Sequence, residues 1–261
     1  MEKRTGKTRS IALVNNKGGV AKTTTAVNLA AGICAEGRRV LLVDLDAQGS
    51  ASLSLGLNRA DLTPGTAEAL LAGRPVSQSI LRTDIPGLDI MAGSMALASA
   101  DLVLSDIEGR ETILKEILNP VKEQYDYMIF DCPPSLGLVT VNALTAADYY
   151  LVPVPPDYLS LEGLVNLFQA VERIKEGIGY AAELLGIVLT LADYRTNANR
   201  EIIELIREHY GRAVFETEIR VNVRLKEAPS FGKTIYDYDR NSTGAEAYRS
   251  ITKEVMKRVN R

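Results

Sequence analysis

A short segment near the N-terminus combines glycines, lysines and hydroxyl groups in a spacing suited to phosphate chemistry. Gly18 and Gly19 let backbone N–H groups approach anionic oxygens without a Cβ between them. Lys22 can reach the β- and γ-phosphates of a nucleoside triphosphate, and the Thr23 hydroxyl can ligate Mg²⁺. The residues expected to contact ATP are Lys17, Gly18, Gly19, Val20, Ala21, Lys22, Thr23 and Thr24.

This loop departs from the usual phosphate-loop pattern, which has glycine where this chain has Asn16 and Ala21. Ala21 fits if its backbone is already near helical, whereas the pattern alone does not explain Asn16. Lys17 is an additional lysine. With it the loop resembles the deviant Walker A motif of the ParA/MinD ATPase family, lysine-glycine-glycine-x-x-lysine-threonine. In that family the early lysine reaches across a dimer interface to the partner's nucleotide, and the resemblance gives this role to Lys17.

Three aspartates follow apolar runs that are typical of buried strands. Asp44 and Asp46 close the run at 40–44, and Asp131 closes the run at 127–131 in the Walker B form. Carboxylates beside a polyphosphate are costly unless a cation or an oriented water compensates them. By resemblance, Asp44 lies by the metal and Asp46 positions the attacking water, while Asp131 holds Mg²⁺ through water. The expected catalytic residues are Lys17, Lys22 and Asp46, and the expected metal residues are Thr23, Asp44 and Asp131.

These residues need a scaffold that brings strand ends together, and the chain alternates strand and helix patterns. Strands are expected at 10–15, 40–44, 88–91, 127–131, 149–154 and 185–191, and helices at 23–36, 159–175 and 198–210. This alternation predicts an α/β fold with a mostly parallel twisted sheet and helices on both faces, in the P-loop NTPase architecture. Ligands of such sheets bind beyond the carboxyl ends of the strands. We expect residues 1–9 to form a basic arm and residues 10–261 to form one ATPase domain.

Composition excludes several other classes of protein. The chain has 261 residues, 46% of them apolar, and no run near the ~20 apolar residues of a membrane-spanning helix. Cys34 and Cys132 make neither a disulfide framework nor a four-ligand zinc site, so a reducing cytoplasm is expected. His209, the one histidine, is expected near a helix C-terminus, where the helix dipole favours it.

The case for DNA combines a weak charge signal with the resemblance. From Arg195 to the end, 14 Lys and Arg stand against 10 Asp and Glu, a local +4 that leaves −7 for the rest of a chain of net charge −3. The resemblance covers residues 11–248 and extends to segments 194–197 and 222–230, which distinguish short chromosomal and plasmid partition proteins of the ParA/Soj type. Arginines matching Arg195 and Arg224 contact DNA without sequence preference there. The candidate DNA contacts are Arg195, Arg224, Lys233 and Arg240, with Arg249 less well supported.

One segment departs from the family's pattern. Where relatives often read Ile-Pro-Arg-Asn, this chain reads Ile219-Arg220-Val221-Asn222. That region lies near the adenine pocket in relatives, so the base contacts are left open while the phosphate chemistry is not. Arg220 would add positive charge there.

The resemblance implies a Mg²⁺-dependent ATPase of weak intrinsic rate that dimerises around ATP and binds nonspecific double-stranded DNA. It would partition chromosome, plasmid or mobile-element DNA with a ParB-like partner, in the cytoplasm on the nucleoid. The alternatives are a MinD-like membrane-surface protein, a ParA-like protein with a protein cargo, and a metabolic or redox enzyme such as an amidoligase. Against the membrane alternative, the apolar positions of 245–261 are expected to dock on the core.

Overall fold

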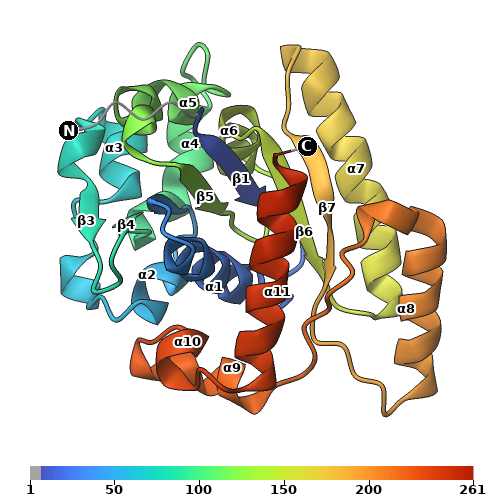
Figure 1. Cartoon of the computed structure of the whole chain (residues 1–261). Helices are drawn as coiled ribbons and strands as arrows, with labels where there is room; N and C mark the ends of the chain where they lie inside the picture. Colours follow the sequence, from blue (N-terminus) through green and yellow to red (C-terminus); the bar gives the residue numbers. More distant parts are fainter. Residues whose placement is uncertain (1–6, 261) are drawn as a thin grey trace.

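The computed structural model describes residues 7–260, which are built around a seven-stranded sheet in the order β3-β4-β2-β5-β1-β6-β7 (Figure 1). Every neighbouring pair is parallel except β3 with β4. The strands are β1 (Arg9–Leu13), β2 (Val40–Asp44), β3 (Ile80–Arg82), β4 (Leu88–Met91), β5 (Tyr127–Asp131), β6 (Tyr149–Val154) and β7 (Glu183–Leu189).

Helices cover both faces because the central strands are apolar on both sides. In β1, Ile11 and Leu13 join one buried cluster while Ala12 joins the other. The first cluster packs under α1 (Lys22–Ala35) and α11 (Thr243–Arg258), with α2 (Ser50–Ser54), α9 (Val223–Glu227) and α10 (Ile235–Tyr238) at its edge. The helices of the opposite face are α3 (Thr66–Ala72), α4 (Ala100–Leu104), α5 (Ile113–Leu118), α6 (Leu138–Ala146), α7 (Tyr158–Ile178) and α8 (Asn197–Tyr210).

Short 3₁₀ turns complete the connections. They are η1 (Arg59–Asp61), η2 (Val76–Gln78), η3 (Met95–Ser99), η4 (Asn119–Gln124), η5 (Gly211–Ala213) and η6 (Ala228–Phe231). The predicted α/β class with a mostly parallel sheet and helices on both faces is confirmed. Four of the predicted strands, at 40–44, 88–91, 127–131 and 149–154, have the observed bounds.

For the strands that were predicted, the differences lie at their ends. The strand predicted at 185–191 runs from Glu183 to Leu189, because Leu191 turns into the left-handed region with φ 53°. The strand predicted from residue 10 begins at Arg9, the last residue of the expected basic arm, and Thr8 is already buried. The rest of that arm, residues 1–6, lies outside the described residues.

The last helix docks on the core as expected. Tyr248, Ile251 and Val255 of α11 are fully buried against α1, and the Tyr248 hydroxyl lies 3.1 Å from Thr25 Oγ1. The apolar face of α11 is therefore already covered. Within residues 7–260, none of the helices has the length and apolar content needed to cross a membrane.

Candidate active site

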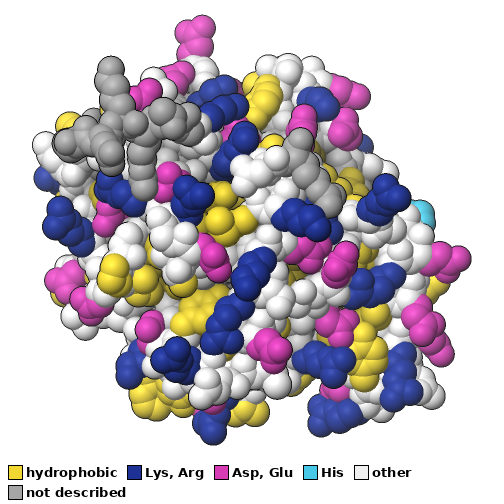
Figure 2. Space-filling model, in the orientation of Figure 1, with side chains coloured by type: hydrophobic (Ala, Val, Ile, Leu, Met, Phe, Trp, Pro, Cys, Tyr) yellow, Lys and Arg dark blue, Asp and Glu magenta, His cyan; other side chains and the backbone are white. Residues whose placement is uncertain are grey.

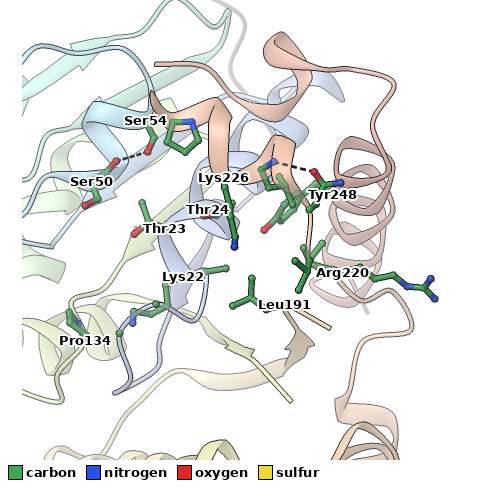
Figure 3. A pocket seen from close by; sticks show the side chains of 18 of the residues that line it. Lys22, Thr23, Thr24, Ser50, Ser54, Pro134, Leu191, Arg220, Lys226 and Tyr248 are labelled. Atoms are coloured by element: carbon green, nitrogen blue, oxygen red, sulfur yellow. Dashed lines mark hydrogen bonds between the residues drawn. The ribbon is translucent and has the colours of Figure 1, made fainter. Parts of the chain in front are cut away.

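A hollow of about 700 Å³ opens beyond the carboxyl ends of the central strands (Figure 3). One wall is the loop between β1 and α1, and a second is the segment from Asp46 to Ser54. The third wall comes from α9 and the chain on either side of it. There Lys226 of α9 extends toward the interior, while Arg220, before the helix, points away from it (Figure 3). Its polar floor, with Ile219, Val221 and Leu225 in the third wall, suits a ligand with an anionic end and a flat apolar end.

Buried hydrogen bonds fix the shape of the loop. The side chain of Asn15 donates to the carbonyl of Pro153 at 2.8 Å and accepts from the backbone N–H of Lys17 at 2.9 Å. The Thr190 hydroxyl donates to the carbonyl of Val20 at 3.0 Å. The loop is thus tied to the ends of β6 and β7, and its N–H groups are held in place before an anion arrives.

Ala21 corrects one expectation. Its backbone is not near right-handed helical but left-handed, with φ 65° and ψ 28°, and it stands immediately before α1. The first hydrogen bond of α1 already involves this residue, because the carbonyl of Ala21 accepts from the backbone N–H of Thr25 at 2.9 Å. The chain therefore changes from loop to helix at Ala21. A side chain in this conformation costs about 1 kcal/mol, which glycine at the same position would avoid.

Lys22 lies in the floor of the hollow and is only 7% exposed. Its ammonium donates to the carbonyl of Lys17 at 2.9 Å. Burial lowers the pKa of Lys22, and the negative charge of Asp131 opposes this shift. An anion entering the hollow would favour the charged form of Lys22, so this lysine is suited to bind phosphate oxygens.

Lys17 does not line the hollow. Its ammonium is bound by both carboxylate oxygens of Asp157, at 2.9 and 2.8 Å. Asp157 also caps α7, where it accepts the backbone N–H of Ser160 at 3.0 Å. Partial burial raises the pKa of Asp157, but the bonds from Lys17 and Ser160 outweigh it and hold this pKa below its usual value. The two lysines of the loop therefore occupy different environments.

Asp44 is fully buried and organises the second wall. One of its oxygens accepts from the Ser52 backbone and hydroxyl, at 3.0 and 2.8 Å, and the other accepts from the Asp46 backbone at 3.2 Å. Burial raises the pKa of Asp44 to about 6, against those hydrogen bonds. Gly93 permits this packing, because a Cβ there would lie 2.7 Å from Asp44 Oδ1. Asp46 is left half-buried on the wall of the hollow.

Asp131 lies beside Asp44 on the adjacent strand and is also fully buried. Neither of its carboxylate oxygens has a hydrogen-bond partner within residues 7–260, although the Thr23 hydroxyl is near enough to lower its pKa. Burial, followed by the charge of Asp44, raises the pKa of Asp131 well above its usual range. A buried, unpartnered carboxylate next to a second one fits a bound cation.

The donor set fits magnesium better than a metal held by protein alone. Among the described residues, no three His, Cys, Asp or Glu side chains converge on one point. Mg²⁺ in proteins is commonly bound by one or two carboxylates together with substrate phosphates and water. Thr23, Asp44 and Asp131 lie together here and are the residues that would hold such an ion.

The candidate DNA contacts are spread over the C-terminal part of the chain. Arg195 lies in the loop before α8, and Arg224 lies in α9. Lys233 follows η6, and Arg240 follows α10 beside Arg249 in a small hollow against α1. Figure 2 shows Lys and Arg side chains along the lower edge of this face, around α8 to α10, with acidic side chains between them. The candidate contacts thus come from separate segments, and Arg240 lies over α1.

Neither the cysteines nor the histidine line the hollow, although Cys132 directly follows Asp131. Cys34 and Cys132 are buried, and burial raises the pKa of the Cys34 thiol to about 12 and also raises that of Cys132. His209 lies in the last turn of α8 with its ring against Tyr210, at 4.7 Å between centroids.

Four residues that shape the site were missed from sequence: Ser52, Gly93, Asp157 and Leu191. The Asp157 contact spans 140 residues of chain, so no local pattern indicates it. Asp157 stands just before the strong helical pattern of α7, where aspartate is typical of a helix cap, and this signal predicts the cap but not the lysine.

Comparisons with known proteins agree with this geometry. A model of the AAA domain family matches residues 8–184. The chain is 43% identical over 250 residues to the chromosome partitioning protein ParA of Myxococcus xanthus, covering 96% of this chain and 88% of that one. It is 44% identical over 245 residues to the sporulation initiation inhibitor protein Soj of Bacillus subtilis, covering 94% and 97%.

A solved structure is similar along the whole chain. The cobyrinic acid a,c-diamide synthase of Mycobacterium smegmatis, with bound ADP and magnesium, is 34% identical with a TM-score of 0.84. The match covers 97% of this chain and 96% of that one.

Proposed function

The chain belongs to the ParA/Soj family of chromosome-partitioning ATPases, and from that premise we propose that it is an ATP-gated switch that dimerises around nucleotide and binds DNA without sequence preference. Hydrolysis, weak alone and stimulated by a ParB-like partner, releases the DNA. The protein acts in the cytoplasm on the nucleoid, and residues 10–261 act as one domain after a basic arm. Allostery of this kind requires that ATP and DNA favour the same state, the dimer.

The residues around the hollow have separate tasks in this proposal. The backbone of residues 18–24 and the ammonium of Lys22 bind the β- and γ-phosphates of ATP. Asp46, which faces the hollow, orients the attacking water. Thr23 and Asp131 hold Mg²⁺, and Asp44 adds negative charge beside them. When bound, Mg²⁺ neutralises the charge that develops on the phosphate oxygens.

The observation that carries the dimer is the position of Lys17. Its ammonium lies outside the hollow of its own protomer, on the carboxylate of Asp157. The side chains of this pair are 39% and 44% exposed, so the pair contributes under about 1 kcal/mol and is easily exchanged. A second protomer's triphosphate offers Lys17 more negative charge than one aspartate does. Lys17 can therefore leave Asp157 and bind the partner's nucleotide.

Light scattering on the Asp46→Ala variant, which should hold ATP without hydrolysing it, tests this directly. We expect the mass of a dimer with ATP and Mg²⁺ and the mass of a monomer with ADP. Adding Lys17→Ala should leave ATP binding in place and abolish the dimer, whereas Lys7→Ala, a change at an exposed lysine of the same charge, should not. Dimers with either nucleotide, or dimers that persist without Lys17, would contradict the proposal.

An amide-forming ligase is the second candidate, because the similar Mycobacterium smegmatis structure is named a diamide synthase. Its identity of 34% is below the 43% and 44% of the two partition relatives. The two activities separate in one assay, since the switch releases phosphate from ATP with no acid or amine acceptor present. ATP turnover that appears only with a carboxylic acid and an amide nitrogen donor would favour the ligase.

A further inference from the structure

Arg195, one of the two arginines proposed to bind DNA, is already engaged by a carboxylate. Its Nε lies 2.9 Å from Asp193 Oδ1 and its Nη2 lies 2.6 Å from Asp193 Oδ2, a two-point fork. These bonds lower the pKa of Asp193 to about 2. Guanidinium groups bind phosphates through the same edge and the same geometry. The carboxylate of Asp193 thus occupies the position that a DNA phosphate would take.

Arg224, the other proposed arginine, is engaged in a similar way. Its Nη1 lies 3.0 Å from Glu227 Oε2, and its Nε lies 3.5 Å from Asp239 Oδ2. The Tyr238 hydroxyl donates to the same Glu227 oxygen at 3.0 Å and keeps this carboxylate in place. Both arginines therefore have carboxylates on the guanidinium edges that phosphates use.

One hollow brings the loop that carries Arg195 next to the helix that carries Arg224. Arg195 lines a hollow of about 600 Å³ together with Val223, the residue that precedes Arg224. A third arginine of this hollow, Arg220, lies over the ring of Tyr194 and 3.3 Å from Glu218. Paired arginine and carboxylate side chains are thus a repeated feature of the surface expected to face DNA, and this surface is less positive than its arginines alone suggest.

We propose that Asp193 and Glu227 act as built-in substitutes for phosphate, which compete with DNA for Arg195 and Arg224 and keep the DNA affinity of one protomer low. This inference rests on the proposed DNA-binding function. A bound phosphate must either displace the carboxylate or tolerate its charge. At about 5 Å in water that charge is worth roughly two- to fourfold in affinity.

The consequence is a sharper switch. Arg195 is 83% exposed on its side chain, so its ion pair is exchanged quickly and does not block the DNA-bound state. In a dimer each weakened arginine–phosphate contact occurs twice. Once one protomer is on DNA, the second protomer meets the same DNA at high effective concentration. Single protomers therefore stay off DNA, while the ATP-bridged dimer retains enough contacts to bind.

The test compares Asp193→Asn with Glu204→Gln, both in the Asp46→Ala background. Glu204 is an exposed carboxylate two turns along α8, so its variant removes the same charge without freeing Arg195. The probe is random-sequence duplex DNA, titrated with ATP at low and moderate salt. Because the two- to fourfold effect occurs once in each protomer of the dimer, we expect Asp193→Asn to bind roughly five- to tenfold more tightly than the Glu204→Gln control at low salt. This gain should shrink as salt screens the charge.

A double variant and the binding of the reference variant decide how the result is interpreted. Adding Arg195→Ala to Asp193→Asn should remove the gain, because no guanidinium is left to release. Equal binding by the Asp193 and Glu204 variants, or weaker binding by Asp193→Asn, overturns the inference and leaves the DNA-binding function intact. Absence of binding by the Asp46→Ala reference itself, with ATP bound and at low salt, overturns the proposed function together with this inference.

Discussion

At the scale of the residue, the site consists of charges that are buried or paired before a ligand arrives. Gly18, Gly19, Lys22 and Asp46 were singled out from the sequence because their types and spacing suit phosphate chemistry, and all four line the hollow. Asp157 and Ser52 could not, because their partners Lys17 and Asp44 are defined only by the folded chain. The left-handed conformation of Ala21 could not be predicted either, since a motif gives residue types and not dihedral angles.

The clearest prediction at this scale concerns Asp131. Replacing it with Asn removes a buried charge that has no hydrogen-bond partner in the described structure. The free energy of unfolding of the nucleotide-free protein should therefore rise by about 1–3 kcal/mol at pH 7. Urea denaturation without nucleotide or Mg²⁺ measures this, and ATP hydrolysis by the same variant should be lost.

The pH dependence gives the control. Burial raises the pKa of Asp131 in the folded state, so the wild-type protein loses stability as the pH rises above the unfolded value of about 4. The advantage of Asp131→Asn should accordingly shrink as the pH falls toward 4, where both states of the wild type are protonated. An advantage that is constant with pH, or a less stable variant at pH 7, would count against the account of this carboxylate.

At the scale of the element, long apolar runs were predictable and short edge elements were not. The strands at the centre of the sheet are uniformly buried, which makes their sequence pattern unambiguous. β3 was missed because it has three residues, lies at the sheet edge and is partly exposed throughout. The α1–α11 contact was only partly foreseen: the docked last helix was expected, but its partner was not.

Gly32 makes that contact possible. A Cβ at Gly32 in α1 would lie 2.3 Å from Thr252 Oγ1 and 2.7 Å from the Tyr236 hydroxyl. Gly32→Ala should therefore force α1 and α11 apart and lower the free energy of unfolding by about 1–3 kcal/mol. The matched control is Gly177→Ala in α7, where a Cβ meets nothing within 4 Å. The control should gain about 0.5–1 kcal/mol from helix propensity, and equal responses at both sites would refute the close contact.

At the scale of the whole molecule, one segment joins the two proposed sites. Ile219 and Asn222 line the nucleotide hollow, and Arg220 and Val221 line both that hollow and the one that contains Arg195. The backbone of this segment pairs with Ala192, next to Asp193. We therefore expect packing changes at the nucleotide to reach the arginine surface along this continuous segment of chain.

The central claim is that ATP turns on DNA binding, and the most direct measurement titrates the Asp46→Ala variant with random-sequence duplex DNA across a salt series. With ATP and Mg²⁺ we expect a DNA-binding constant K whose logarithm falls against log salt with a slope of roughly −3 to −4. This slope corresponds to four phosphate contacts, made by Arg195 and Arg224 of each protomer. Binding should be weak with ADP and lost in Arg195→Ala plus Arg224→Ala. Equal affinity with ATP and ADP, or no binding at low salt by a protein shown to hold ATP, would contradict the account.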